Sequence, residues 1–225
     1  MSFSELAWTR VGSWYDAILT HPFIGALGAG TLPTDIYARY LLDDAHYLSG
    51  YSKALAAIGS RAPDALGGAL FARSAAGAVE AEGELHRGFL APLGIDPDAY
   101  DATEPSPTCR AYVGTLQADA AFGPVEVAMA GVLPCFRVYA EVGRAIAATQ
   151  PRDDHPYVSW IGTYADPAFD KAVAEVEAYT DELAAAVSQA RRDRMLAAYE
   201  RATRFEWMFW DSAWRGEGWP QPARP

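Results

Sequence analysis

The sequence predicts an all-α bundle of long helices, and three observations support this prediction. Helix-capping residues recur along the chain, apolar residues recur at spacings of three and four, and no run of strand length alternates apolar and polar side chains. The 225 residues suffice for one large domain, and no linker-like stretch divides them. We therefore predict a single helical domain over 1–219 and a flexible tail over 220–225.

In the first half of the chain, capping and breaking residues place the helices. Ser2 and Glu5 fit a capping box in front of the first helix. The glycines and prolines of 21–33 predict a loop. Pro63 ends the second helix, and Pro92 ends the third. The expected helices span about 4–19, 34–60 and 64–91.

In the second half, proline behind a capping residue marks most helix starts, because proline is favoured at the first helical position. The starting signals are Ser106-Pro107, Gly123-Pro124, Asp154-His155-Pro156, Asp166-Pro167 and Ser188. The helices that start at Ser106, Asp154, Asp166 and Ser188 end near 120, 162, 187 and 213. The helix that opens at 123–126 carries Cys135.

Charge and composition exclude several classes of function. The formal net charge of −11 argues against nucleic acid, because binding phosphates needs a basic surface. No apolar run reaches the length of a membrane span, and the first ten residues lack the pattern of a signal peptide. The two cysteines, Cys109 and Cys135, are therefore expected to be reduced thiols of a cytoplasmic protein.

Cys135 follows a proline inside the apolar helix of 128–143, and Tyr139 lies one turn further on. Pro134 cannot donate a backbone hydrogen bond, so it leaves the carbonyl of Ala130 free and re-aims the side chain that follows. The sequence thus allows a reactive thiol at a kink or an inert, buried cysteine. Cys109, at the start of a helix, is expected to be structural.

Asp44 interrupts an apolar, tyrosine-rich face of the helix over 34–60. That face carries Tyr37, Tyr40, Leu41, Tyr47, Leu48 and Tyr51. Asp43, about 100° around the helix, is expected to reach solvent. A carboxylate among such neighbours needs a partner. Asp44 either accepts hydrogen bonds from tyrosine hydroxyls as a structural residue or binds a ligand.

Glu206 repeats this arrangement on the last helix, whose apolar face carries Leu196, Tyr199, Thr203, Trp207 and Trp210. A glutamate buried among aromatic rings has a raised pKa, which suits a proton donor or acceptor. The alternative is a side chain whose stem lies under the rings and whose carboxylate reaches solvent. Three inward polar groups, Asp44, Cys135 and Glu206, suggest one shared cavity with a nucleophile, an acid/base and an anchor for a flat ring.

Other chemistries have less support in the sequence. No histidine is placed near Cys135, and no Gly-rich phosphate loop is present. Glu82 and His86 lie one turn apart and could form half of a metal site, but the second Glu-x-x-His motif of a di-iron bundle is absent. We therefore expect no metal and no cofactor, although a metal-dependent oxidase remains an alternative.

The motifs, taken in order, make the chain resemble the TenA / thiaminase II family over nearly its whole length, from Phe3 to Trp219. The matching stretches are His21-Pro22-Phe23, Gly30-Thr31-Leu32-Pro33, Tyr40-Leu41-Leu42-Asp43-Asp44, Glu82 to His86, Pro105-Ser106-Pro107-Thr108 with Tyr112, Leu133-Pro134-Cys135 with Tyr139 and Glu141, Trp160-Ile161-Gly162-Thr163-Tyr164, Glu206 with Phe209-Trp210, and Glu217-Gly218-Trp219.

This resemblance implies a haem-oxygenase-like helical bundle without haem, usually assembled as a homotetramer. With Cys135, the chain resembles the cysteine-bearing branch of the family, which salvages pyrimidine fragments of thiamin. That branch hydrolyses 4-amino-5-aminomethyl-2-methylpyrimidine to the 5-hydroxymethyl compound and ammonia, and it cleaves thiamin into pyrimidine and thiazole. The rival class is a pyrimidine-binding or regulatory protein without turnover, which the presence of Asp44, Cys135 and Glu206 disfavours.

The resemblance also implies a role for each site residue. Cys135 corresponds to the nucleophile that adds to the pyrimidine ring, Glu206 to the acid/base, and Asp44 to the anchor of the aminopyrimidine edge. The tyrosines correspond to residues that line the ring (Tyr47 and Tyr112) or donate hydroxyls near the thiol (Tyr139 and Tyr164). His46 and Asp211, beside site positions, are less typical of the family and bear on the substituent that the substrate carries.

Overall fold

The computed structural model describes residues 1–85 and 103–221, and within them it contains helices and no strand. The described part has ten helices, α1 (Phe3–Arg10), α2 (Gly12–Leu19), α3 (Pro22–Gly28), α4 (Thr34–Arg61), α5 (Ala65–Leu85), α7 (Pro107–Phe122), α8 (Val125–Ala147), α9 (Val158–Tyr164), α10 (Pro167–Ala186) and α11 (Gln189–Arg215). The predicted all-α fold is confirmed.

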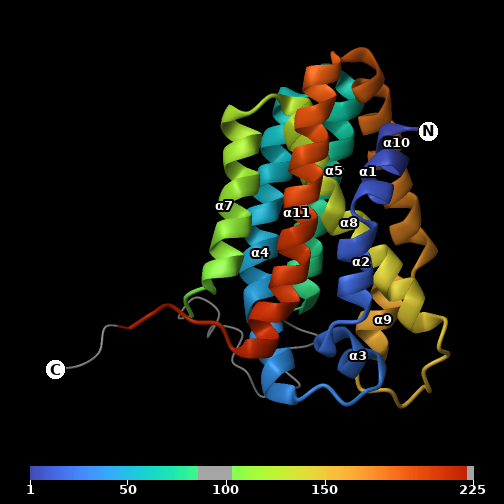
Figure 1. Cartoon of the computed structure of the whole chain (residues 1–225), viewed down its shortest axis with the longest axis vertical. Coiled ribbons are helices and arrows are strands. Elements are labelled where there is room, and N and C mark those ends of the chain that lie inside the picture. Colours follow the sequence, from blue (N-terminus) through green and yellow to red (C-terminus); the bar gives the residue numbers. More distant parts are fainter. Residues whose placement is uncertain (86–102, 222–225) are drawn as a thin grey trace.

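The long helices run roughly side by side (Figure 1). Helix α4 packs against α5 and α7, and α8 packs against α10 and α11. The short helices α3 and α9 lie at one end of the bundle, and α1 and α2 line one side of it (Figure 1). No helix in the described ranges is long and apolar enough to cross a membrane.

The predicted helix caps are largely confirmed. Ser2 and Glu5 form the reciprocal capping box, with each side chain accepting a hydrogen bond from the other's backbone N–H. Ser106, Asp166 and Ser188 each accept a backbone N–H of the helix that they open. Side-chain caps thus fix where α1, α7, α10 and α11 begin.

Three predictions of helix boundaries are wrong or shifted. The helix expected over 4–19 is two helices, because the chain bends at the fully buried Val11 and Gly12 follows with a weak helix propensity. The loop expected over 21–33 contains α3, because Pro22 occupies the first helical position and His21 Nδ1 caps it by accepting from Phe23 N.

The helix expected from 154 to 162 begins later, at 158, and ends at 164. The residues in front of it form turns, in which His155 Nδ1 accepts a hydrogen bond from the backbone of Tyr157. Helix α5 is described to Leu85, so the part of the expected helix over 86–91 lies outside the described residues. The end of the predicted tail, 222–225, does so as well.

Helix α8 stays helical through Pro134. The hydroxyl of Tyr51, on α4, donates to the carbonyl of Val132 at 2.9 Å, two residues before the proline. This bond connects α4 and α8 directly beside Cys135.

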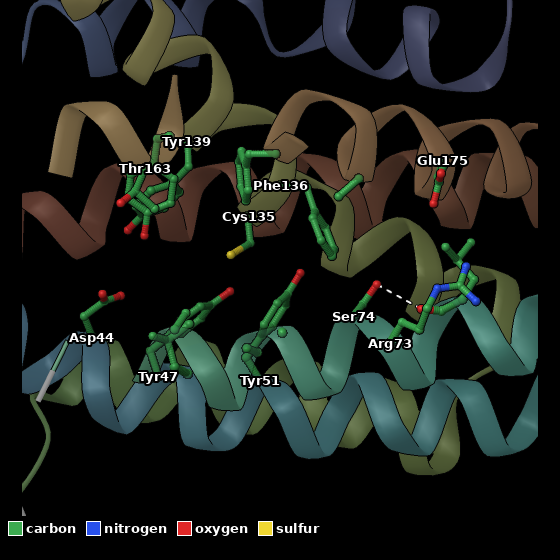
Figure 2. A pocket seen from close by; sticks show the side chains of 18 residues that line it. Asp44, Tyr47, Tyr51, Arg73, Ser74, Cys135, Phe136, Tyr139, Thr163 and Glu175 are labelled. Carbon is green, nitrogen blue, oxygen red and sulfur yellow. Dashed lines mark hydrogen bonds between the residues drawn. The ribbon is translucent and has the colours of Figure 1, made fainter. Parts of the chain in front are cut away.

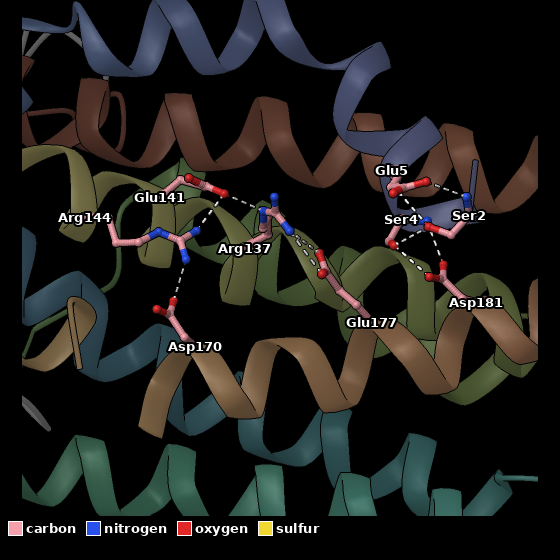
Figure 3. Close-up of polar contacts among 9 residues, drawn as sticks. All are labelled: Ser2, Ser4, Glu5, Arg137, Glu141, Arg144, Asp170, Glu177 and Asp181. Carbon is pink, nitrogen blue, oxygen red and sulfur yellow. Dashed lines mark hydrogen bonds and ion pairs between the residues drawn. The ribbon is translucent and has the colours of Figure 1, made fainter. Parts of the chain in front are cut away.

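An ion-pair chain connects α8 to α10 (Figure 3). Glu141 contacts both Arg137, at 2.8 Å, and Arg144, at 2.7 Å. These arginines reach α10 at Glu177, 3.1 Å away, and Asp170, 2.8 Å away. Because the pairs share partners and are partly buried, they stabilise the contact of α10 with α8, the helix that carries Cys135.

Candidate active site

A cavity of about 310 Å³ lies between α4, α5, α8, α9 and α10, and it falls at the lower end of the range typical of small-molecule sites. Its lining residues are Asp44, Tyr47, Leu48, Tyr51, Leu70, Arg73, Ser74, Gly77, Ala78, Ala81, Cys135, Phe136, Tyr139, Thr163, Tyr164, Phe169, Ala172 and Glu175. Five of the seven predicted site residues are among them.

Asp44 lies at one end of this cavity, with its carboxylate directed inward (Figure 2). The side chain is 5% exposed, and no donor in the described part of the chain hydrogen-bonds it. Burial, and then the charge of Asp43, raises its pKa to about 7. The alternative of a structural aspartate held by tyrosine hydroxyls therefore finds no support in the described residues.

Asp43, expected to reach solvent, is half-buried instead. Its carboxylate accepts a hydrogen bond of 2.9 Å from the backbone N–H of Ser106 and so connects α4 to the start of α7. The two neighbouring carboxylates thus have different surroundings, since one is bound to backbone and the other faces the cavity.

Cys135 lies near the middle of the cavity, and its sulfur faces the Tyr47 and Tyr51 side chains (Figure 2). The thiol is deep in the bundle but touches the open volume of the cavity. Burial, and then the charge of Glu206, raises the pKa of the thiol well above its usual value, while the hydroxyls of Tyr47 and Tyr51 partly oppose this increase. The resting enzyme therefore holds a thiol, and its proton has to be removed when the sulfur attacks.

The aromatic wall continues beyond Tyr47 (Figure 2). The ring of Tyr47 stacks on the ring of Tyr51, with centroids 5.3 Å apart, and its centroid lies 5.0 Å from that of the Tyr112 ring. Tyr139 and Tyr164 form the opposite wall, with centroids 4.8 Å apart. The hydroxyl of Tyr47 is buried and has no hydrogen-bond partner in the described residues, so it can serve a ligand or the thiol.

Glu206 is 1% exposed, so the alternative of a carboxylate in solvent is wrong. The hydroxyl of Tyr112 donates to its Oε1 at 2.7 Å. Burial raises the pKa of Glu206 to about 8, although the bond from Tyr112 partly lowers it. Neither Glu206 nor Tyr112 lines the cavity, but the ring of Tyr112 packs against that of Tyr47, which does.

Cys109 is buried, and its sulfur lies 3.4 Å from the backbone carbonyl of Asp43. Burial raises the pKa of this thiol too. Cys109 does not line the cavity. Its position fits the structural role expected of it.

His46 and Asp211 both lie away from the main cavity. His46 lines a second cavity of about 190 Å³ beside α11, and its Nε2 lies 2.9 Å from the carbonyl of Thr103. Asp211 pairs with Arg215 at 2.6 Å and with His21 at 3.5 Å. Neither residue contacts the volume next to Cys135, so neither is placed to select a substituent there.

The sequence prediction missed the side of the cavity formed by α5 and α10. These helices contribute, among others, Arg73, Ser74, Phe169 and Glu175. Helix α5 is rich in alanine and glycine, so no polar residue on it stands out from an apolar stripe. Only the packing of α5 and α10 against α4 and α8 identifies these residues.

In the described ranges, no group of three or more histidine, cysteine, aspartate or glutamate side chains could hold a metal ion. The Glu82–His86 pair lies outside the part of the chain whose side chains are described.

The fold places the chain in the class of haem-oxygenase-like bundles. Haem oxygenase from Leptospira interrogans superimposes with a TM-score of 0.59 at 15% identity, over 94% of this chain and all of the other, which shows the fold alone. A TenA homologue from Pyrococcus horikoshii is closer, with a TM-score of 0.86 at 28% identity over 96% of this chain and all of that chain.

The chain belongs to the TENA/THI-4/PQQC family, whose model matches residues 8–216. An aminopyrimidine aminohydrolase of Bacillus subtilis is 34% identical over 99% of this chain and 94% of its own length. A thiamine biosynthesis multifunctional protein, ThiED, of Corynebacterium efficiens is 39% identical, but the match covers 96% of this chain and only 29% of that longer protein. The family predicted from the sequence is confirmed.

Proposed function

We propose that this protein is an aminopyrimidine aminohydrolase with thiaminase II activity, which uses Cys135 as its nucleophile. The observation that carries the proposal is a thiol in the middle of an aromatic cavity, with an unpartnered carboxyl group at one end. The full-length likeness to the Bacillus subtilis aminohydrolase supports the same activity. Purified protein should convert 4-amino-5-aminomethyl-2-methylpyrimidine to the hydroxymethyl compound and ammonia, and absence of both products would contradict the proposal.

Asp44 would hold the edge of the aminopyrimidine. With a pKa of about 7, a fraction of this carboxyl group carries a proton at neutral pH. A protonated Asp44 donates to the ring nitrogen and accepts from the neighbouring amino group, which withdraws electrons from the ring and favours addition of the thiol. Tyr47, Tyr139 and Tyr164 would enclose the ring, whose flat faces match aromatic walls.

Glu206 would move the proton that the thiol has to lose. Its pKa of about 8 lies near a neutral working pH, which suits a group that both accepts and donates protons. The carboxylate lies close enough to the thiol for its charge to raise the pKa of Cys135. Tyr112, bonded to Oε1 of Glu206, would hold this carboxylate in place.

The proposed reaction balances with water as the only co-reactant. The sulfur bonds to a ring carbon, its proton passes to Glu206, and the bond from the exocyclic methylene to the leaving nitrogen breaks. Glu206 returns the proton to the departing amine, which leaves as ammonia. Water then adds to the methylene, its second proton returns to the sulfur through Glu206, and the carbon–sulfur bond breaks. With thiamin, the leaving group is the neutral thiazole.

Asp44→Asn is expected to weaken binding of the aminomethylpyrimidine by about tenfold to a hundredfold, because a buried hydrogen bond to a charged or acidic group contributes about 1.5–3 kcal/mol. Wild-type protein should also reject the des-amino pyrimidine, which leaves the carboxyl group without a partner. Calorimetric titration measures both affinities. Asp35→Asn is the matched control, since Asp35 is an exposed aspartate of the same helix that pairs with Arg39 outside the cavity. Equal affinity of the wild type for amino and des-amino ligands would remove Asp44 from this role.

We also propose that the protein forms homotetramers in the cytoplasm. The large apolar content favours an assembly that buries helix faces between subunits in closed symmetry. Light scattering should give a mass about four times the 24.3 kDa of one chain. A stable monomer at micromolar concentration would refute the assembly, while the catalytic proposal would stand because Asp44, Cys135 and Glu206 come from one chain.

A further inference from the structure

We propose that the end of the cavity opposite Asp44 is a subsite for the leaving group, and that Arg73 there recognises an anionic substituent such as a phosphate ester. The inference rests on the proposed function, because that function places the pyrimidine between Asp44 and Cys135. It deepens that function by naming which substrates the cavity would prefer.

The cavity has a closed end and an open end. Asp44, Tyr139 and Tyr164 surround the first, and Asp44 is buried. Arg73 and Glu175 lie on opposite sides of the second, and both side chains are exposed (Figure 2). With the ring at the closed end, the remaining volume extends from Cys135 toward Arg73. A leaving group larger than ammonia has to occupy that volume.

The middle of this volume is mostly apolar, and the two hydroxyls that lie there, those of Tyr51 and Ser74, each donate to a backbone carbonyl (Figure 2). Its walls are Leu70, Ala78 and Ala81 of α5, Phe136 of α8, and Phe169 and Ala172 of α10. A flat or apolar ring suits these walls, whereas a polar chain would lose its hydration there. The charged residues lie only at the rim, so a substrate that fits the whole cavity has an apolar body and a charged end.

The ion pairs at the rim of the cavity indicate whether the charged end of the substrate is an anion or a cation. Glu175 has a cationic neighbour, Lys171, 3.9 Å away. Arg73 is the one cationic side chain among the described lining residues, and no carboxylate of the described ranges lies within ion-pair distance of it. Most other arginines of this acidic chain do have such partners, Arg137, Arg144 and Arg191 among them. Arg73 is thus available to an external anion.

A guanidinium group matches a phosphate ester well, because its planar array of N–H donors can bond two phosphate oxygens at once. The reaction itself is unchanged. The bond between the methylene and the thiazolium nitrogen breaks, its electron pair stays on the thiazole, and water supplies the hydroxyl of the pyrimidine product and releases one proton. Arg73 would contact the phosphate on the departing half and take no part in the proton transfers.

The test compares kcat/KM for thiamin monophosphate with kcat/KM for thiamin, because the two substrates differ only at the far end of the leaving group. Arg73→Gln should lower the ratio of these constants by about fivefold, the upper end of what one exposed charge pair contributes. Arg152→Gln is the matched control. It removes the same charge from an exposed arginine that does not line the cavity, and the ratio should stay at its wild-type value.

An unchanged ratio in Arg73→Gln, or an equal fall in Arg152→Gln, would overturn the subsite while leaving the proposed function intact. Calorimetric titration of both compounds against the same three proteins tests the subsite without turnover. Absence of turnover with every substrate would contradict the proposed function. In that case, a loss of affinity for the phosphate ester confined to Arg73→Gln would still support the anion site, and equal affinities would refute it.

Discussion

Cys135→Ser lowers kcat/KM for the aminomethylpyrimidine by about a thousandfold to ten-thousandfold, because a serine hydroxyl is a far weaker nucleophile than a cysteine sulfur. The substitution keeps the size of the side chain, so the helical circular dichroism spectrum and the affinity for the hydroxymethyl product should change little. Steady-state kinetics of the purified variant measures the loss.

Cys109→Ser is the matched control for this substitution. Cys109 is buried at the start of α7, and its sulfur contacts only the backbone carbonyl of Asp43 on α4, so its replacement should leave kcat/KM within about twofold of the wild-type value. Full activity in both variants would exclude a covalent mechanism through either thiol.

Glu206→Gln is expected to lower kcat by about a hundredfold to a thousandfold, which is the usual contribution of general acid–base catalysis. Glutamine keeps an oxygen that can accept the bond from Tyr112, so KM should change much less than kcat. A change confined to KM would mean that Glu206 only contributes to binding.

The proposed roles of Glu206 and Asp44 also predict the direction in which kcat/KM changes with pH. Glu206 acts as a carboxylate when it accepts the thiol proton, so wild-type kcat/KM falls at low pH as Glu206 becomes protonated. Asp44 acts in its protonated form, so kcat/KM also falls at high pH. With a pKa of about 8 for Glu206 and about 7 for Asp44, kcat/KM follows a bell-shaped curve centred between pH 7 and 8. The apparent pKa of each side of the curve belongs to the pair of groups and not to one residue.

Glu206→Gln should abolish the fall on the acid side and keep the fall on the alkaline side. Tyr112→Phe is the matched variant. It removes a hydrogen bond that lowers the pKa of Glu206, so the two pKa values move further apart, the optimum of the bell should move to higher pH and its maximum should fall. Thiamin is the suitable substrate for this profile, because its thiazolium charge does not titrate. An acid limb that persists unchanged in Glu206→Gln would assign it to another group.

Local signals were sufficient to predict most of the fold. A serine cap is recognisable because its effect is confined to a few residues, as at Ser2 and Ser188. The break at Val11 was not predictable, because burial of that side chain against other helices sets the bend. Pro22 does not distinguish a loop from a helix start by itself, because proline is favourable in both.

The site residues could be predicted where helical periodicity places a polar side chain on an otherwise apolar helix face. Asp44 and Glu206 stood out because a carboxylate on an apolar stripe needs an explanation, and both are buried. The depth of Glu206 behind Tyr112 was not predictable, since it depends on how α11 packs against α7. Arg73 gave no signal, because an exposed arginine on an alanine-rich helix is ordinary until α10 packs opposite it.

The most direct test of the central claim follows the oxygen of water into the product. The protein is incubated with the aminomethylpyrimidine in water enriched in oxygen-18, and the products are analysed by mass spectrometry. The proposed mechanism predicts ammonia and a hydroxymethylpyrimidine that carries the heavy oxygen, formed by the wild type and by Cys109→Ser but not by Cys135→Ser. Unlabelled product, or labelled product formed equally well by Cys135→Ser, would contradict hydrolysis through this thiol.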